Sequence, residues 1–359
     1  MNMVLKKQAD FWQSKIQNQS SRRNSSWLLG CAALILLGAL GSAQVAAQGC
    51  DVYVPTHKSN SVAVVRTFGG PTPGGTVTGV IPVGIQPLSA AISPDKAFVY
   101  VTNSGWMFGS NSVSVIDTTT YNVVATIPVG NFPIGVAFTP NGAFAYVVND
   151  GSNNVSVIDT ATRSVAATIG VGTNPWGVAI TPDGALAYVT NQASNSVSVI
   201  NTASNSVVTT VPAGVNPTGV SITPNGAFAY VANFSSDTIS VISTASNAVV
   251  ATIADGVRPH AIAFTPEGAT AYVANDGSND VSVINTATNT LTATIPVGND
   301  PRGVAVTPMG RYVYVGNRFS DTLSIIDTAT NSVVATVQGV SVFPEAVVIN
   351  DHVSSGGCG

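Results

Sequence analysis

The sequence predicts an all-β fold, a seven-bladed β-propeller with four antiparallel strands per blade, and three observations carry this prediction. A unit of about 42 residues repeats along most of the chain. Each unit holds four short segments rich in β-branched residues, separated by turn residues. A proline opens each unit, at Pro87, Pro133, Pro175, Pro217, Pro259, Pro301 and Pro344.

One unit shows the four expected strands in order. Gly177–Thr181 gives strand A, and Ala187–Asn191 gives strand B. Residues 196–201 alternate with period two and give strand C, and strand D starts at Val207. Thr181–Gly184 makes the A–B turn, because Pro presets φ and Gly accepts a positive φ. The C–D link begins with Asp or Asn followed by Thr, whose side chains can bond nearby backbone N–H groups.

The two ends of the repeat region predict how the ring closes. Strand A occurs seven times, and its last copy, Glu345–Ile349, has no strand B after it. Strands B to D also occur seven times, and their first copy, which starts at Tyr53, has no strand A before it. We therefore expect the C-terminal strand A to join the N-terminal strands B to D, which closes the ring and protects its edges.

Residues 1–47 are expected to form an export signal and residues 48–359 a single propeller. The first 26 residues are polar and basic, an apolar run of 14 residues follows at Trp27–Leu40, and small residues end at Ala47, after which we place cleavage. The alternative is an uncleaved anchor that contacts the membrane through residues 27–47. Either way we expect export, to the periplasm, the cell surface or the medium.

The cysteines fit an exported protein. Cys31 lies inside the expected signal, which leaves Cys50 and Cys358 at the two ends of the propeller. Cys50 precedes the first strand B and Cys358 follows the last strand A, and these strands are neighbours in the closing blade. We therefore predict a disulfide across the closure. The alternative is a pair of free or intermolecular thiols.

The strand-B segments carry a family resemblance. They read Tyr-Val-Thr-Asn at 100–103 and 188–191, with close variants in four further units, whereas the first copy departs and reads Tyr-Val-Pro-Thr at 53–56. Over about residues 51–350 the chain resembles the YVTN-repeat β-propeller family, which is found in exported and surface-layer proteins. The resemblance implies the propeller fold and export. Its wider relatives include lactonase-type propellers and propeller domains of some redox enzymes.

Charge and motifs exclude several classes of function. The whole chain has a net charge of −4, and the expected mature part has eight basic and sixteen acidic residues, a net −8, which argues against a nucleic-acid partner. The sequence has no zinc-type Cys/His spacing, phosphate-binding glycine loop or nucleophile elbow. We therefore expect no cofactor and no metal site.

The candidate site comes from the positions where the units differ. The B–C and D–A loops should share one face, here called the top face, around the mouth of the central channel. The residues after the opening Pro and after the strand-B Asn vary most on these loops. The predicted ligand- or partner-binding residues are His57, Lys58, Trp106, Phe108, Trp176, Arg258, His260, Asp300, Arg302, Arg318 and Glu345.

These residues suggest a pocket with a charged half for an anionic or polar group and an aromatic half for an apolar or sugar-like group. The competing interpretation is that variable loops have drifted and their charges only solvate the surface. The favoured function is an exported interaction platform with an unknown protein or glycan partner at the cell envelope. One alternative is a lactonase- or lyase-like enzyme in which His260, Arg302 and Glu345 act as base, anion stabiliser and acid. The other is a structural envelope component.

Overall fold

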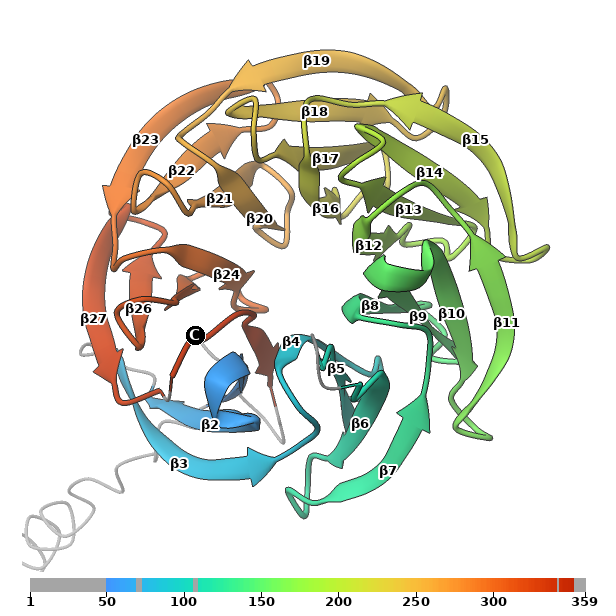
Figure 1. Ribbon diagram of the computed structural model, residues 1–359. Coiled ribbons are helices and arrows are strands. Elements are labelled where there is room, and N and C mark those ends of the chain that lie inside the picture. Colours follow the sequence, from blue (N-terminus) through green and yellow to red (C-terminus); the bar gives the residue numbers. More distant parts are fainter. Residues whose placement is uncertain (1–49, 69–72, 106–108, 341, 352–359) are drawn as a thin grey trace, which may run out of the picture. The chain divides into compact units, whose positions relative to one another are not determined.

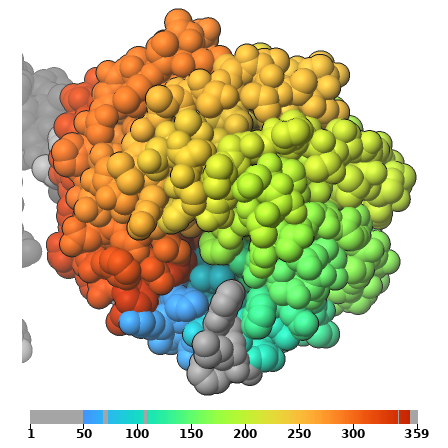
Figure 2. All heavy atoms as spheres, turned by 45° about the horizontal axis from the view of Figure 1, so that its top comes forward, coloured from blue at the N-terminus to red at the C-terminus, as the bar shows by residue number. Residues whose placement is uncertain are grey.

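Seven four-stranded antiparallel sheets surround a central axis, which confirms the predicted seven-bladed propeller (Figure 1). The computed structural model describes residues 50–68, 73–105, 109–340 and 342–351. Two short 3-10 helices, η1 (His57–Ser59) and η2 (Asp150–Ser152), lie in B–C loops. Figure 2 shows the atoms of neighbouring blades in continuous contact around the ring.

In six blades the strands run from the channel to the rim in chain order, and in the closing blade β28 lies innermost, before β1, β2 and β3. The innermost strands are β4 (Pro87–Ile92), β8 (Pro133–Phe138), β12 (Pro175–Ile180), β16 (Pro217–Ile222), β20 (Pro259–Phe264), β24 (Pro301–Val306) and β28 (Val348–Asn350). The second strands are β1 (Asp51–Thr56), β5 (Phe98–Asn103), β9 (Phe144–Asn149), β13 (Leu186–Asn191), β17 (Phe228–Asn233), β21 (Thr270–Asn275) and β25 (Tyr312–Asn317).

The third and fourth strands form the outer half of each blade. The third strands are β2 (Ser61–Phe68), β6 (Ser112–Asp117), β10 (Asn154–Asp159), β14 (Ser196–Asn201), β18 (Thr238–Ser243), β22 (Asp280–Asn285) and β26 (Thr322–Asp327). The rim strands are β3 (Gly74–Pro82), β7 (Val123–Pro128), β11 (Ser164–Gly170), β15 (Ser206–Pro212), β19 (Ala248–Ala254), β23 (Thr290–Pro296) and β27 (Ser332–Gln338).

The ring closes in the predicted way, because β28 pairs antiparallel with β1 in the sheet β28-β1-β2-β3. The strand itself is shorter than predicted. Only Val348–Asn350 pairs as a strand, although the Glu345 N–H still donates to the Pro55 carbonyl at 3.1 Å. Pro55 has no N–H to donate in return, so the ladder is interrupted there. The departure of the first repeat copy from the usual pattern therefore loosens the closing strand.

The repeated polar residues hold the blades together. The Asn that ends each second strand from β5 to β25 is fully buried. In β13, for example, the Asn191 amide donates to the hydroxyls of Ser196 (3.2 Å) and Ser198 (3.0 Å) on the third strand. Burying an amide is favourable only when its donors are satisfied. These Asn residues therefore have a structural task inside their own blades.

The repeated Tyr joins neighbouring blades. The Tyr146 hydroxyl donates to Asn205 Oδ1 in the C–D turn of the next blade at 2.7 Å, and three further tyrosines, Tyr188, Tyr230 and Tyr272, bond equivalent Asn residues. Arg163 replaces the Asn that Tyr100 would meet, and its guanidinium lies over the Phe98 ring, 5.0 Å from the ring centroid. Tyr100 is therefore buried without this inter-blade hydrogen bond.

Candidate site at the mouth of the channel

The top-face loops are linked around the whole ring. The residue before each opening proline has a positive φ, and its N–H donates to an Asn or Asp side chain in the B–C loop of the preceding blade. Asp300 N–H, for example, donates to Asn279 Oδ1 at 2.9 Å. This bond fixes where each innermost strand begins. It therefore fixes the side chain that follows the proline, such as Arg302.

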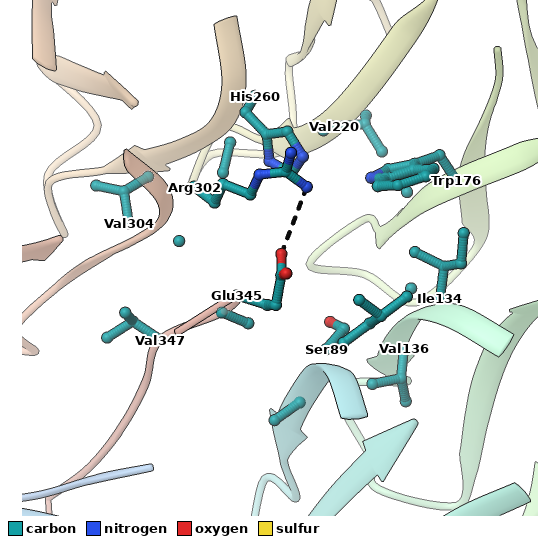
Figure 3. Close-up of a pocket in the computed structure, with 18 of the residues that line it drawn as sticks. Ser89, Ile134, Val136, Trp176, Val220, His260, Arg302, Val304, Glu345 and Val347 are labelled. Carbon is teal, nitrogen blue, oxygen red and sulfur yellow. Dashed lines mark hydrogen bonds and ion pairs between the residues drawn. The ribbon is translucent and has the colours of Figure 1, made fainter. Parts of the chain in front are cut away.

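A cavity of about 280 Å³, here called the mouth cup, opens where the innermost strands meet (Figure 3). Its upper ring consists of residues that directly follow an opening proline: Leu88, Ile134, Trp176, His260, Arg302 and Glu345. Side chains two residues further along a strand face the same side, one step deeper. They form an apolar collar under the upper ring: Ala90, Val136, Val178, Val220, Ile262, Val304 and Val347.

Glycines between the two rings keep the cup narrow. A Cβ atom on Gly177 would lie 2.6 Å from the Thr218 carbonyl oxygen of the next innermost strand. Gly219 approaches the His260 carbonyl even more closely. Atoms of a real side chain do not fit at such distances, so glycine lets adjacent strands approach backbone to backbone.

Two arginines and three carboxylates form one ion-pair network beside the cup. Glu345 accepts from Arg318 Nε at 2.7 Å and from Arg302 Nη1 at 3.4 Å. Asp300 accepts from Arg318 Nη1 at 3.1 Å and from Arg302 Nε at 3.4 Å, and Asp276 accepts from Arg302 Nη2 at 3.3 Å. All five side chains are at most 20% exposed. Every nitrogen of the Arg302 guanidinium thus faces a carboxylate.

Burial and proximity set the protonation of the acidic members. Burial first, and then the neighbouring Asp300, raises the pKa of Asp276 to about 6. The pKa of Asp300 is lowered, because Arg302, Arg318 and a hydrogen bond from Asp276 together outweigh its burial. With Asp276 protonated the network is neutral, and with Asp276 ionised it carries one negative charge.

His260 connects this network to aromatic side chains. Its ring lies edge-on to Trp176, with centroids 5.9 Å apart, and edge-on to Phe234 at 6.5 Å. Burial, and next the positive charge of Arg302, lowers the pKa of His260 to about 3, so the imidazole is neutral at physiological pH. The charged and aromatic parts therefore meet at His260, and Figure 3 shows it beside Arg302 at the cup.

The structure brings together only some of the predicted site residues. Trp176, His260, Arg302 and Glu345 line the cup, and Asp300 and Arg318 support it through the ion pairs. The remaining described members lie outside its lining. They are His57, Lys58 and Arg258. The His57 backbone N–H donates to the Phe343 carbonyl, and the Lys58 ammonium lies 3.8 Å from the centroid of the Phe343 ring. The Arg258 guanidinium lies over the Phe234 ring, 5.6 Å from its centroid. Trp106 and Phe108 lie outside the described residues.

Two members of the site are missing from the predicted set. Asp276 completes the ion pairs of Arg302, and Phe234 contacts His260. Both directly follow a strand-B Asn, which is one of the two most variable positions of the repeat. The variable position thus marks them, but only the fold shows which of its seven residues contact the residues that line the cup.

Of the described residues that line the cup, Arg302 is the only one with a positive charge. It is already paired with three carboxylates, so an anionic ligand would meet no spare positive charge there. Within the described ranges, no group of three or more His, Cys, Asp or Glu side chains is placed to hold a metal ion.

The described residues include no helix that is long and apolar enough to cross a membrane.

The predicted disulfide is described at one end only. Cys50 is 2% exposed, and its N–H donates to Thr67 Oγ1 at 3.1 Å. Cys358 lies outside the described residues, so the pairing stays a prediction.

Two family models match parts of the repeat region. A YNCE-like β-propeller model matches residues 263–347, and a model of the lactonase 7-bladed β-propeller matches residues 164–249. Neither is the YVTN-repeat family. The first segment contains Asp300, Arg302, Arg318 and Glu345, and the second contains Trp176. Comparison with curated protein sequences finds no match.

Solved structures share the fold over most of the chain. One is a chain of hydrazine synthase from Kuenenia stuttgartiensis, with 26% identity and a TM-score of 0.65, and the match covers 77% of this chain and 96% of that one. Another is a functionally unknown protein from Desulfotomaculum acetoxidans DSM 771, with 20% identity, a TM-score of 0.71, and coverage of 83% and 98%. Sequence and structure comparisons thus agree that this chain is a β-propeller.

Proposed function

We propose that this chain is an exported binding module that engages a cell-envelope partner through the mouth cup. One observation carries the proposal. The residue after the opening proline, one of the two positions that differ most between otherwise uniform repeats, lines a single cavity in six of the seven blades. Six blades supply the upper ring of that cavity, each with a different side chain, whereas the collar beneath is uniformly apolar. A concave site with a few converging polar groups is the usual form of a ligand site.

The electrostatics of the cup favour binding over catalysis. A general base works best with a pKa near the operating pH, and the pKa of His260 is about 3. Glu345 accepts from Arg318 Nε at 2.7 Å and from Arg302 Nη1 at 3.4 Å, so both of its carboxylate oxygens are engaged in ion pairs. Arg302 is occupied by three carboxylates. His260 is thus poorly suited to act as a base, and the proposed anion stabiliser and acid are engaged in ion pairs with each other and with neighbouring charges.

The enzyme alternative has two observations of its own, the lactonase family match and the likeness to hydrazine synthase. The matched lactonase segment, residues 164–249, includes neither His260, Arg302 nor Glu345. It contains one whole blade, β12 to β15, with the last strand of the blade before and most of the blade after, and so reports the repeat rather than these residues. Export of the module is supported by the basic and apolar pattern of residues 1–47 and by the YVTN-like strand motif.

Capture from the envelope fraction of the source cells tests the proposal. The bait would be residues 48–359 as wild type, as Trp176→Ala, and as Met309→Ala. Met309 is 67% exposed in an A–B turn. The Met309→Ala substitution therefore removes a similar apolar surface from the face of the propeller opposite to the cup. We expect one partner that wild type and Met309→Ala retain and Trp176→Ala loses. Equal capture by all three baits, or none, would refute the cup as the binding site.

A further inference from the structure

The ligand class follows from how the charges of the cup are used. The ion-pair network contains two guanidinium groups and three carboxylates, so its net charge is zero when Asp276 holds a proton and minus one when Asp276 is ionised. Each carboxylate already faces at least one arginine nitrogen. An anionic ligand would have to displace Glu345 from Arg302, and a cationic ligand would compete with Arg302 for Glu345. Both exchanges lose a partly buried ion pair, which is costly.

The groups that remain available are mixed donors and acceptors. Each terminal guanidinium nitrogen of Arg302 has two N–H groups and keeps a second donor when one is engaged, and a carboxylate oxygen accepts more than one hydrogen bond. One nitrogen of the neutral His260 imidazole interacts with the Arg302 backbone, which leaves the other as an acceptor, and Ser89 adds a hydroxyl to the lining. Alcohol groups match such a surface best, because each can donate and accept at the same position.

The remaining walls are apolar and one is flat. Figure 3 shows the Trp176 indole across the cup from Glu345 and Arg302, with Val136, Val220, Val304 and Val347 among the surrounding side chains. An indole ring covers apolar C–H surface well and costs little conformational entropy. The cavity of about 280 Å³ holds one ring-sized group rather than an extended chain.

We propose that the mouth cup binds a single neutral hexopyranose residue, presented at the end of an envelope glycan. The C–H face of the sugar packs on Trp176, and its hydroxyls bond Arg302, Glu345 and His260. This inference rests on the proposed binding function and adds the class of its ligand. A hexopyranose combines an apolar ring face with alternating donor–acceptor hydroxyls and has no net charge, which the internally paired cup requires.

Isothermal titration of residues 48–359 with matched sugars tests the ligand class. The probes are the methyl glycosides of glucose, galactose and mannose, with methyl glucuronide and glucosamine as the charged counterparts. We expect one neutral glycoside to bind at least tenfold more tightly than either charged sugar. Tighter binding of a charged sugar, or no binding of any neutral glycoside, would overturn the inference.

Variants separate a stacking site from nonspecific association. Trp176→Ala should weaken the best glycoside at least tenfold, Trp176→Phe should stay within about threefold of wild type because it keeps an aromatic face, and Met309→Ala should not change it. Circular dichroism would show that each variant keeps the β-sheet spectrum. Unchanged binding by folded Trp176→Ala contradicts the inference.

A second readout distinguishes this inference from the proposed function. The envelope capture is repeated after periodate oxidation of the envelope fraction, which destroys sugar rings with adjacent hydroxyls. Loss of the partner after oxidation supports the sugar ligand. Capture that survives oxidation and still depends on Trp176 keeps the binding module but overturns the sugar. Absence of capture before oxidation refutes the proposed function itself.

Discussion

Asp255 occupies an apolar position of the repeat, and replacing it with Val should stabilise the propeller. Five other units place Val or Ala here, and Val83, Val129, Val171, Ala213 and Val297 all pack against the apolar cores of the blades. Neither Asp255 carboxylate oxygen has a hydrogen-bond partner, although both are buried. Burying a carboxylate without a partner disfavours its ionised form.

The size of the effect follows from the pKa of Asp255. Burial raises it from 3.8 to about 6, although Ser282 and the Gly256 backbone partly oppose the rise, and the negative charges of Asp280 and Asp237 add to it slightly. As pH rises past 3.8 the unfolded chain loses its proton first, so stability falls until the folded carboxyl ionises near pH 6. The loss is complete above that pH and amounts to about 3 kcal/mol. Asp255→Val removes this loss.

Urea unfolding at pH 4 and pH 8 measures it. Because about 0.6 kcal/mol of the loss is already present at pH 4, we expect Asp255→Val to gain about 2.4 kcal/mol more over wild type at pH 8 than at pH 4. This difference corresponds to about 4 °C in melting temperature. Asp255→Asn keeps the shape without the charge and should show the same pH-dependent part without the packing gain. Val297→Asp is the reverse change in the next blade and should introduce the same pH-dependent loss. A gain for Asp255→Val that is equal at both pH values would refute the reasoning.

Three further predictions concern the ring. Tyr146→Phe should lower the unfolding free energy by about 1 kcal/mol, because it removes an inter-blade hydrogen bond. Tyr100→Phe should have no measurable effect, because Arg163 takes the place of the Asn that would accept from its hydroxyl. Equal losses for the two variants in urea titrations would contradict this. Gly177→Ala should destabilise the protein by roughly 1–3 kcal/mol, since its Cβ would meet a backbone carbonyl of the next blade. Gly170→Ala is the control and should be neutral, because a Cβ atom there has open space around it. Calorimetry measures both changes. Adding a reductant to the oxidised protein, residues 48–359, should lower its stability by about 2–5 kcal/mol. Cys358→Ser should be insensitive to the reductant and should be as stable as the reduced wild type. A wild type that is insensitive to the reductant would exclude the predicted closure disulfide.

Most of the fold could be predicted from the sequence because the repeat carries local information seven times. Each unit contains its own turn residues, its β-branched strands and its buried Tyr and Asn, so blade number and strand order follow from counting. The short closing strand is the exception, because its pairing depends on Pro55, far away in the chain, which lacks the N–H that the ladder needs.

For the candidate site, the sequence predicted several of the residues that take part, and the tertiary structure decided how they are paired. Sequence variation at two repeat positions determined which residues to consider, including Trp176, His260, Arg302 and Glu345. Only the tertiary structure decided that Arg302 is paired with three carboxylates, one of them the unpredicted Asp276. Ion pairs within a few ångströms join side chains from different blades, and Coulomb energy depends on those distances rather than on spacing along the chain. The sequence therefore determined where to look, and the geometry of the ring decided that the charges there are satisfied internally.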